Sequence, residues 1–145
     1  MYTTASYALD HVTLSTEQKS FIFTVDACKD IHIYLSHVPG VLVDQAYEIS
    51  LGTSDNTQSS ITKSLPDREN RQFTTNGILG CDPNGKSLWI SWSEGDIKVG
   101  QGSVTGQGQL FSWTDSQPYN IHALAIASRD TAQTVKWTFL RESGQ

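Results

Sequence analysis

The chain has 145 residues, of which 37% are hydrophobic and 17% are charged, so it is poorer in both classes than an average globular protein. This composition excludes a coiled coil, and no apolar run approaches the length of a membrane-spanning helix. The 15 acidic and 10 basic residues give a formal charge of −5, which disfavours nucleic acid as a partner. We expect residues 1–145 to form a single domain.

The first half of the chain alternates hydrophobic and polar residues with period two, which is typical of half-buried β-strands. A polar stretch over residues 64–76 predicts an exposed loop that includes a short strand. The strands expected in this half lie at 21–27, 31–35, 47–51, 60–63 and about 72–75.

The second half is more strongly patterned. Residues 87–93 predict a strand that carries Trp89 and Trp92 on opposite faces. A core position is favoured over a ligand contact for Trp89 and, less strongly, for Trp113. Glu94-Gly95-Asp96 indicates a tight turn before the next strand. Further strands are expected at 97–100, 110–113, 121–128 and 134–140.

These patterns predict an all-β protein. Eight to ten short strands with regularly spaced turns, and no convincing amphipathic helix, favour a two-layer antiparallel β-sandwich of jelly-roll type. A closed barrel is the alternative.

Two cysteines, Cys28 and Cys81, leave two alternatives open: one disulfide, or two buried free thiols. The chain starts without a charged and apolar leader, and it has no Asn-x-Ser/Thr glycosylation sequence. Export is therefore unsupported, and the compartment stays open.

Motifs for catalysis and cofactor binding are weak. The four histidines, His11, His32, His37 and His122, lack the spacing of a zinc site. The glycine-rich run 100–106 has Thr105 where a dinucleotide loop needs its third glycine, and a strand rather than a helix is expected after it. We expect no metal, no cofactor and no enzymatic activity.

Binding chemistry is better represented, because sugar sites combine an aromatic face with planar hydrogen-bonding side chains. Three segments carry these residue types: 53–60, 92–96 and 113–119. Core tryptophans and polar turns are the structural alternatives at each place. The candidate ligand-binding residues are Asp55, Asn56, Gln58, Trp92, Glu94, Asp96, Trp113, Asp115 and Tyr119.

Several blocks of the chain together resemble the farnesoic acid O-methyltransferase-like domain, with matching order and spacing over about residues 7–140. The segments that carry this resemblance are 21–36, 47–52, 56–61, 88–92, 97–100 and 111–115. One departure is Thr53-Ser54-Asp55, where the family pattern commonly has a Gly-Trp-Gly-like turn.

The resemblance implies a recognition module. Such domains occur alone, in tandem or within larger animal extracellular proteins, and some invertebrate members behave as lectins. The family name implies methyl transfer from S-adenosylmethionine to a sesquiterpenoid acid, yet the chain has no methyl-donor loop and is too β-rich for the usual methyltransferase fold.

We therefore expect a metal-independent lectin that binds glycans and forms a homo-oligomer, since multivalency raises the avidity of weak sugar sites. An extracellular location fits this reading. The alternatives are a protein-interaction module without a small ligand and a farnesoic acid methyltransferase.

Overall fold

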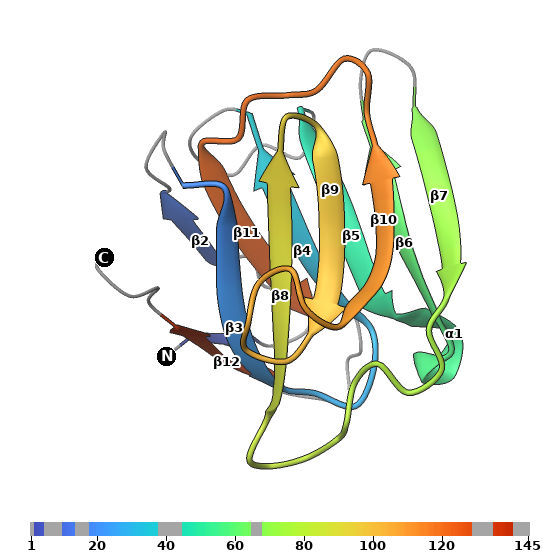
Figure 1. The fold of residues 1–145 in the computed structure, drawn as a ribbon. Coiled ribbons are helices and arrows are strands. Elements are labelled where there is room, and N and C mark those ends of the chain that lie inside the picture. Colours follow the sequence, from blue (N-terminus) through green and yellow to red (C-terminus); the bar gives the residue numbers. More distant parts are fainter. Residues whose placement is uncertain are drawn as a thin grey trace.

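The computed structural model describes residues 2–4, 10–13, 18–37, 45–64, 68–128 and 135–140. They form two six-stranded antiparallel sheets packed face to face (Figure 1). The β8 sheet has the order β1-β12-β3-β8-β9-β10, and the β5 sheet has the order β2-β11-β4-β5-β6-β7. This confirms the predicted all-β, two-layer antiparallel sandwich.

The described residues form twelve strands and one short helical turn. In chain order these are β1 (Tyr2–Thr4), β2 (Asp10–Thr13), β3 (Ser20–Asp26), β4 (Ile31–Ser36), β5 (Ala46–Gly52), α1 (Thr53–Asn56), β6 (Gln58–Lys63), β7 (Glu69–Thr74), β8 (Lys86–Ser93), β9 (Asp96–Gln101), β10 (Gln109–Thr114), β11 (Ala123–Ser128) and β12 (Val135–Leu140).

The strand count within the described residues exceeds the eight to ten expected. β1 and β2 have only three and four residues, too few for an alternating pattern to be visible. β7 occupies much of the stretch expected as a loop, and its burial is low throughout because it is an edge strand. Among the described residues, no helix combines the length and the apolar character needed to cross a membrane.

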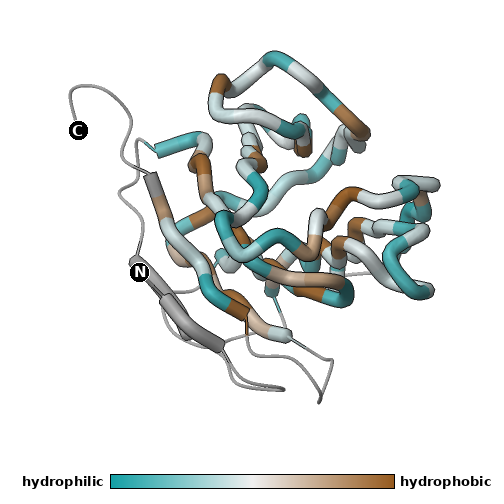
Figure 2. The backbone as a smooth tube through the Cα atoms, turned by 90° about the horizontal axis from the view of Figure 1, so that it is seen from below, coloured by the Kyte–Doolittle hydropathy of each residue, from teal (hydrophilic) through white to brown (hydrophobic). Residues whose placement is uncertain are grey.

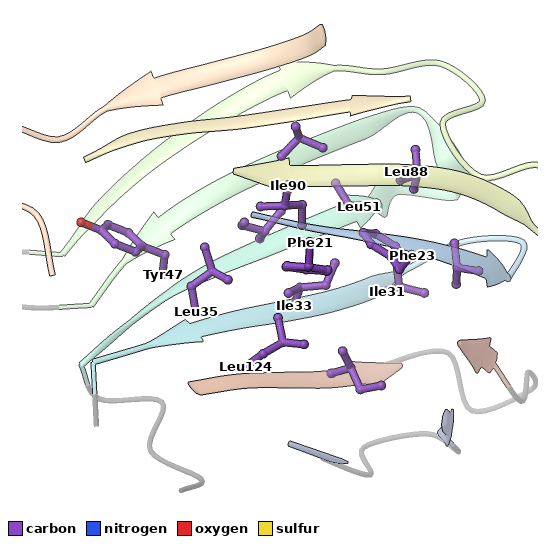
Figure 3. Close-up of a cluster of buried hydrophobic side chains, with 14 of the residues drawn as sticks. Phe21, Phe23, Ile31, Ile33, Leu35, Tyr47, Leu51, Leu88, Ile90 and Leu124 are labelled. Carbon is purple, nitrogen blue, oxygen red and sulfur yellow. The ribbon is translucent and has the colours of Figure 1, made fainter. Parts of the chain in front are cut away.

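The core lies between the two sheets and follows from the period-two pattern. Along β3, inward residues are buried and outward residues are partly exposed. Figure 3 shows side chains from both sheets meeting in this layer, with Tyr47 at one end. Along the chain, hydrophobic and hydrophilic positions are interleaved rather than gathered into one long run (Figure 2). Burying each large apolar side chain stabilises the fold by about 1.5–3 kcal/mol.

Trp89 and Trp92 lie on opposite faces of β8, as predicted. Trp92 belongs to the core between the sheets, whereas Trp89 is fully buried on the outer side of the β8 sheet. The β9–β10 connection passes over β8 (Figure 1), and the Trp89 indole Nε1 donates to the Gln107 carbonyl oxygen at 2.6 Å. A surface position is thus turned into a second small buried site by a covering loop.

Cys28 and Cys81 form a disulfide, which resolves the two alternatives. The bond joins the β3–β4 turn to the segment before β8, 53 residues further along the chain. The same segment is held a second time, because the Asn56 amide donates to the Leu79 carbonyl oxygen at 2.7 Å and accepts from the Leu79 amide at 3.1 Å. At the end of the sandwich near α1, this segment is therefore fixed both by the disulfide and by the hydrogen bonds to Asn56.

Packing of the Trp89 ring against the β9 backbone gives a test of this arrangement. A methyl group at Gly100 would overlap the Trp89 indole ring, whereas at Gly80 its nearest neighbour is 3.7 Å away. We expect Gly100→Ala to lower the free energy of unfolding by about 1–3 kcal/mol, as overpacking does. Urea denaturation measures the change, with Gly80→Ala as the matched control. Equal stability of the two variants would contradict this packing.

Candidate functional site

The candidate ligand-binding residues predicted from the sequence divide between the two ends of the sandwich. Tyr47, near the start of β5, lies close to the 113–119 segment, because its hydroxyl donates to Asp115 at 2.7 Å. β5 ends at Gly52, where α1 begins. Figure 1 accordingly places α1 at the opposite end from the β8–β9 turn. Segments 92–96 and 113–119 are brought together, and segment 53–60 is not.

At the α1 end, the three predicted residues differ in their surroundings. Ser54, Asp55 and Asn56 all have positive φ, so this turn is left-handed. The Asn56 side chain is committed to the Leu79 backbone. The Asp55 side chain is 90% exposed and lies 3.7 Å from the Lys29 ammonium. Gln58 is exposed at the start of β6.

At the other end, the tight turn predicted at Glu94-Gly95-Asp96 is present: Glu94 and Gly95 form it, both with positive φ, and Asp96 already pairs with Ser93. The Asp115 amide donates to the Gly95 carbonyl oxygen at 2.9 Å, which joins this turn to the segment after β10. Asp96 accepts from the Thr114 hydroxyl at 3.2 Å and pairs with Lys98 at 3.4 Å. The second and third predicted segments therefore form one continuous surface.

Asp115 is the centre of a buried polar network. Its carboxylate pairs with the Lys63 ammonium at 2.6 Å and accepts from the Tyr47 hydroxyl and from the Gln117 amide at 3.0 Å. Lys63 also donates to the Gln117 carbonyl oxygen at 2.7 Å and lies over the Tyr119 ring at 5.0 Å. These groups satisfy one another, so the network positions the 113–119 segment against the β5 sheet.

The network shifts two pKa values in opposite directions. Burial alone would raise the pKa of Asp115, but the hydrogen bonds from Lys63 and Tyr47 hold it below its ordinary value. Burial, together with the hydrogen bond to Asp115, raises the pKa of Tyr47 far above its ordinary range. At neutral pH the carboxylate is ionised and the phenol is neutral.

Trp113 is half-buried between the edges of the two sheets. The Arg71 guanidinium lies 5.2 Å from the centre of its ring, and the Tyr47 ring meets it edge-on at 6.1 Å. Next to it, Phe73 of β7 stacks on Phe111 of β10 with ring centres 4.4 Å apart. These four side chains, Arg71, Trp113, Phe73 and Phe111, form an edge clasp that closes the sandwich between β7 and β10.

A pocket of about 350 Å³ lies beside the β8–β9 turn, and we refer to it as the end pocket. Three of the predicted residues line it, namely Trp92, Glu94 and Tyr119. The remaining lining residues are Lys19, Ser93, Gly95, Pro118, Asn120 and Ile121. Apart from Lys19, which precedes β3, the lining comes from the end of β8, the β8–β9 turn and the connection between β10 and β11.

A second polar surface was not predicted, and it covers the outer face of the β5 sheet. Strand register aligns two rows of four side chains across β4, β5, β6 and β7. All eight side chains can form hydrogen bonds. The rows, together called the polar face, are Tyr34, Glu48, Thr62, Asn70 and His32, Ser50, Ser60, Gln72.

The β4 side of the polar face is closely hydrogen-bonded. One Glu48 carboxylate oxygen lies 2.8 Å from His32 Nδ1 and accepts from the Tyr34 hydroxyl at 3.3 Å. His32 also lies 2.9 Å from the Ser50 hydroxyl through Nδ1 and 2.9 Å from Asp30 through Nε2. His32 and Tyr34 are buried and Glu48 is half-buried, so these contacts fix the positions of the polar groups.

The β7 side of the polar face is open. The Gln72 amide donates to the Asn70 side-chain oxygen at 2.9 Å, and the Asn70 amide donates to the Thr62 hydroxyl at 2.6 Å. Asn70 and Gln72 are exposed, whereas Thr62 is buried. The exposed part of the polar face is therefore a pair of planar amides at the sheet edge, next to the half-buried Glu48 carboxylate.

The sequence carried a partial signal for this face. Alternation in 31–36 and 46–52 places polar residues on the side opposite the core, which is where His32, Glu48 and Ser50 lie. The pattern did not determine the register that aligns the strands, and it did not predict the full strand at 69–74 that contributes Asn70 and Gln72.

Comparison with known proteins gives a family and a fold. A family model described as farnesoic acid O-methyltransferase matches residues 4–143. No match is found among curated proteins. Among solved structures, sheep galectin-11 in complex with glycerol is similar, with a TM-score of 0.60 and 8% sequence identity, covering 93% of this chain and 98% of that one.

The buried ion pair gives a stability prediction. Asp115→Asn removes the counter-charge of Lys63 while keeping the shape of the side chain, and uncompensated buried charges are costly. We expect the free energy of unfolding to fall by about 3–5 kcal/mol in urea denaturation. Asp55→Asn, at an exposed carboxylate near Lys29, should change it by no more than about 0.5 kcal/mol. A small effect at Asp115 would show that the network contributes little.

The raised pKa of Tyr47 gives a pH prediction. Folding keeps the phenol protonated, so its contribution is fully present below the pKa of an unfolded tyrosine, about 10, and is lost as the pH rises above it. Tyr47→Phe should therefore reduce the slope of stability against pH above pH 10, by up to about 1.4 kcal/mol per pH unit. Denaturant titrations from pH 8 to 11 measure both proteins. Parallel curves would contradict the assignment.

Proposed function

Because the chain belongs to the farnesoic acid O-methyltransferase family, and its fold is a β-sandwich shared with a galectin, we propose that it is a carbohydrate-binding protein. The polar face of the β5 sheet is the proposed glycan site. The observation that carries this proposal is the register of the two rows, which sets eight hydrogen-bonding side chains side by side on four strands.

A polar outer face is usual in an antiparallel sandwich, so the residue types decide the argument. Sugar hydroxyls both donate and accept, and planar carboxylate, amide and imidazole groups bind them in a fixed direction. The polar face contains all three kinds in Glu48, Asn70, Gln72 and His32. The described outward positions of the β8 sheet strands β3, β8, β9 and β10 carry no amide except Gln109 at the start of β10, and no imidazole.

The contacts within the face favour weak but specific binding. Glu48 is held by two neighbours and Asn70 by two, so a ligand orders few side chains when it binds. Recognition through these side chains needs no metal ion. Asn70 and Gln72 are the exposed members of the polar face, Glu48 is half-buried, and the other five side chains are buried. A shallow site of this kind gains from several copies acting together, which supports a homo-oligomer as part of the proposal.

Methyl transfer is the second candidate, and the name of the matching family favours it. It requires S-adenosylmethionine to bind, so calorimetric titration of the protein with this compound tests it directly. A heat of binding that saturates at one S-adenosylmethionine per chain would support a methyltransferase and would count against glycan binding as the main activity. The galectin likeness in fold supports the lectin instead.

A glycan array, with and without EDTA, tests the proposed function. We expect saturable binding to one glycan class that survives EDTA. Asn70→Ala and Gln72→Ala should each weaken it by about 3–10-fold, the effect of one neutral hydrogen bond of 0.5–1.5 kcal/mol. Both residues are exposed, so the fold should tolerate the changes.

Ser112→Ala is the matched control, because Ser112 is exposed on β10, the edge strand of the other sheet. Its affinity should equal that of the wild type. If both Asn70→Ala and Gln72→Ala bind glycan with wild-type affinity, the polar face is not the glycan site. An array with no binding would favour a protein-interaction module.

A further inference from the structure

We propose that the end pocket is a second saccharide site, so that one chain binds two sugar residues at separate places. The ligand class rests on the proposed function, whereas the location rests on the pocket itself. The pocket residues are 19, 92–95 and 118–121, and none of them belongs to the polar face.

The walls of the end pocket come from three distant segments that are fixed to one another. The Trp92 amide donates to the Lys19 carbonyl oxygen at 2.9 Å, and the Asp115 amide donates to Gly95 at 2.9 Å. A methyl group at Gly95 would meet the ring of Pro118, so the turn and the β10–β11 connection are in close contact. The buried network around Asp115 lies directly behind this connection. The pocket is therefore preformed.

The size of the pocket suits a single sugar ring. Its volume of about 350 Å³ is at the lower end of the range of small-molecule sites. Tyr119 contributes a half-buried aromatic ring, which is packed against Tyr47 at 5.1 Å and His37 at 6.1 Å between ring centres. Lys63 also lies over this ring at 5.0 Å, so the part of the ring that lines the pocket is what a pyranose C–H group can contact.

One residue that lines the pocket, Trp92, carries a buried donor without a partner in the described part of the chain. Trp92 is only 5% exposed, and its indole Nε1 has no hydrogen-bond partner among the residues that the structure describes. A buried N–H left without an acceptor costs about 1–3 kcal/mol. The Trp89 indole, in contrast, donates to a carbonyl oxygen. The Trp92 indole N–H is therefore a sensitive reporter of changes at the pocket wall.

Charge further narrows the ligand class. The ionisable side chains lining the pocket are Lys19, Glu94 and Tyr119, so the formal charges of the first two cancel at neutral pH. A phosphate or a cation would gain little from this balance. A neutral polyhydroxyl ligand is favoured, because Glu94, Ser93 and Asn120 supply acceptors and donors at the rim.

Two sites on one chain would change how the protein acts on glycan-bearing surfaces. A chain with sites on one sheet face and at one end can bridge two glycans by itself. A homo-oligomer would then multiply the cross-linking that each chain already provides.

The experiment is NMR of ¹⁵N-labelled full chain, which resolves the indole N–H signals of the four tryptophans. The probes are the methyl glycosides of galactose, glucose, mannose and N-acetylglucosamine, each titrated alone to 50 mM. The Trp92 signal is assigned with Trp92→Phe. We expect at least one glycoside to shift the Trp92 signal saturably while the Trp89 signal stays in place.

Variants separate the two sites. Asn120→Ala and Glu94→Gln should each weaken the Trp92 titration at least threefold, whereas Gln72→Ala on the polar face and the distant Asp55→Asn should leave it unchanged. A Trp92 signal that no glycoside moves overturns the second site. If Gln72→Ala still weakens binding on the glycan array, the polar face remains the proposed glycan site and only the second site is rejected. If a glycoside shifts the Trp92 signal saturably and the polar-face variants bind glycans with wild-type affinity, the second site is supported and the polar face is rejected as a glycan site.

Discussion

A buried pair of opposite charges, Lys63 and Asp115, joins the two layers of this sandwich at one end. Lys63 belongs to the β5 sheet, and Asp115 directly follows β10 of the β8 sheet. Removing two charges from water costs several kcal/mol, and such a pair is stable only when further hydrogen bonds complete it. Here Tyr47 and the Gln117 backbone complete it. The connection that crosses from one sheet to the other, and with it the wall of the end pocket, depends on this contact.

The period-two geometry of the strands lets the β5 sheet serve two purposes. In β4 and β5, Ile33 and Ile49 face the core as a register pair, and the adjacent positions form the Tyr34–Glu48 pair on the other face. A one-residue slip in register would exchange the two sets, placing a carboxylate in the core. The buried isoleucines therefore position the polar face indirectly, because any register that keeps them inside also keeps Glu48 outside.

Local pattern was enough to predict most strands and the layer architecture. Phe21 to Ala27 alternates clearly, and Glu94-Gly95 is a turn that local sequence specifies, so both were predicted correctly. β7 was missed in part because an edge strand with polar residues has no apolar face to reveal it. The pairing of Cys28 with Cys81 depends on a contact across 53 residues, which spacing alone does not determine.

The site residues were harder to predict for the same reason. Asp115 has the chemistry of a sugar ligand, but its partner Lys63 lies 52 positions earlier in the sequence, so its place in an internal network was not visible. Asn56 likewise looks like an exposed amide until Leu79 is seen beside it. Trp92, Glu94 and Tyr119 were predicted because aromatic and polar residues cluster locally, and the fold gathers these three around one pocket.

The edge clasp between β7 and β10 has a further consequence for how the protein behaves at high concentration. A sheet edge exposes backbone groups that can template the addition of strands from other molecules, which leads to aggregation. On β7 the inward side chains Arg71 and Phe73 are engaged by Trp113 and Phe111, and Glu69 adds a charge beside Arg71. A strand arriving at this edge meets charged side chains held in place by aromatic rings. The clasp that closes the sandwich thus also protects its longer exposed edge from uncontrolled assembly.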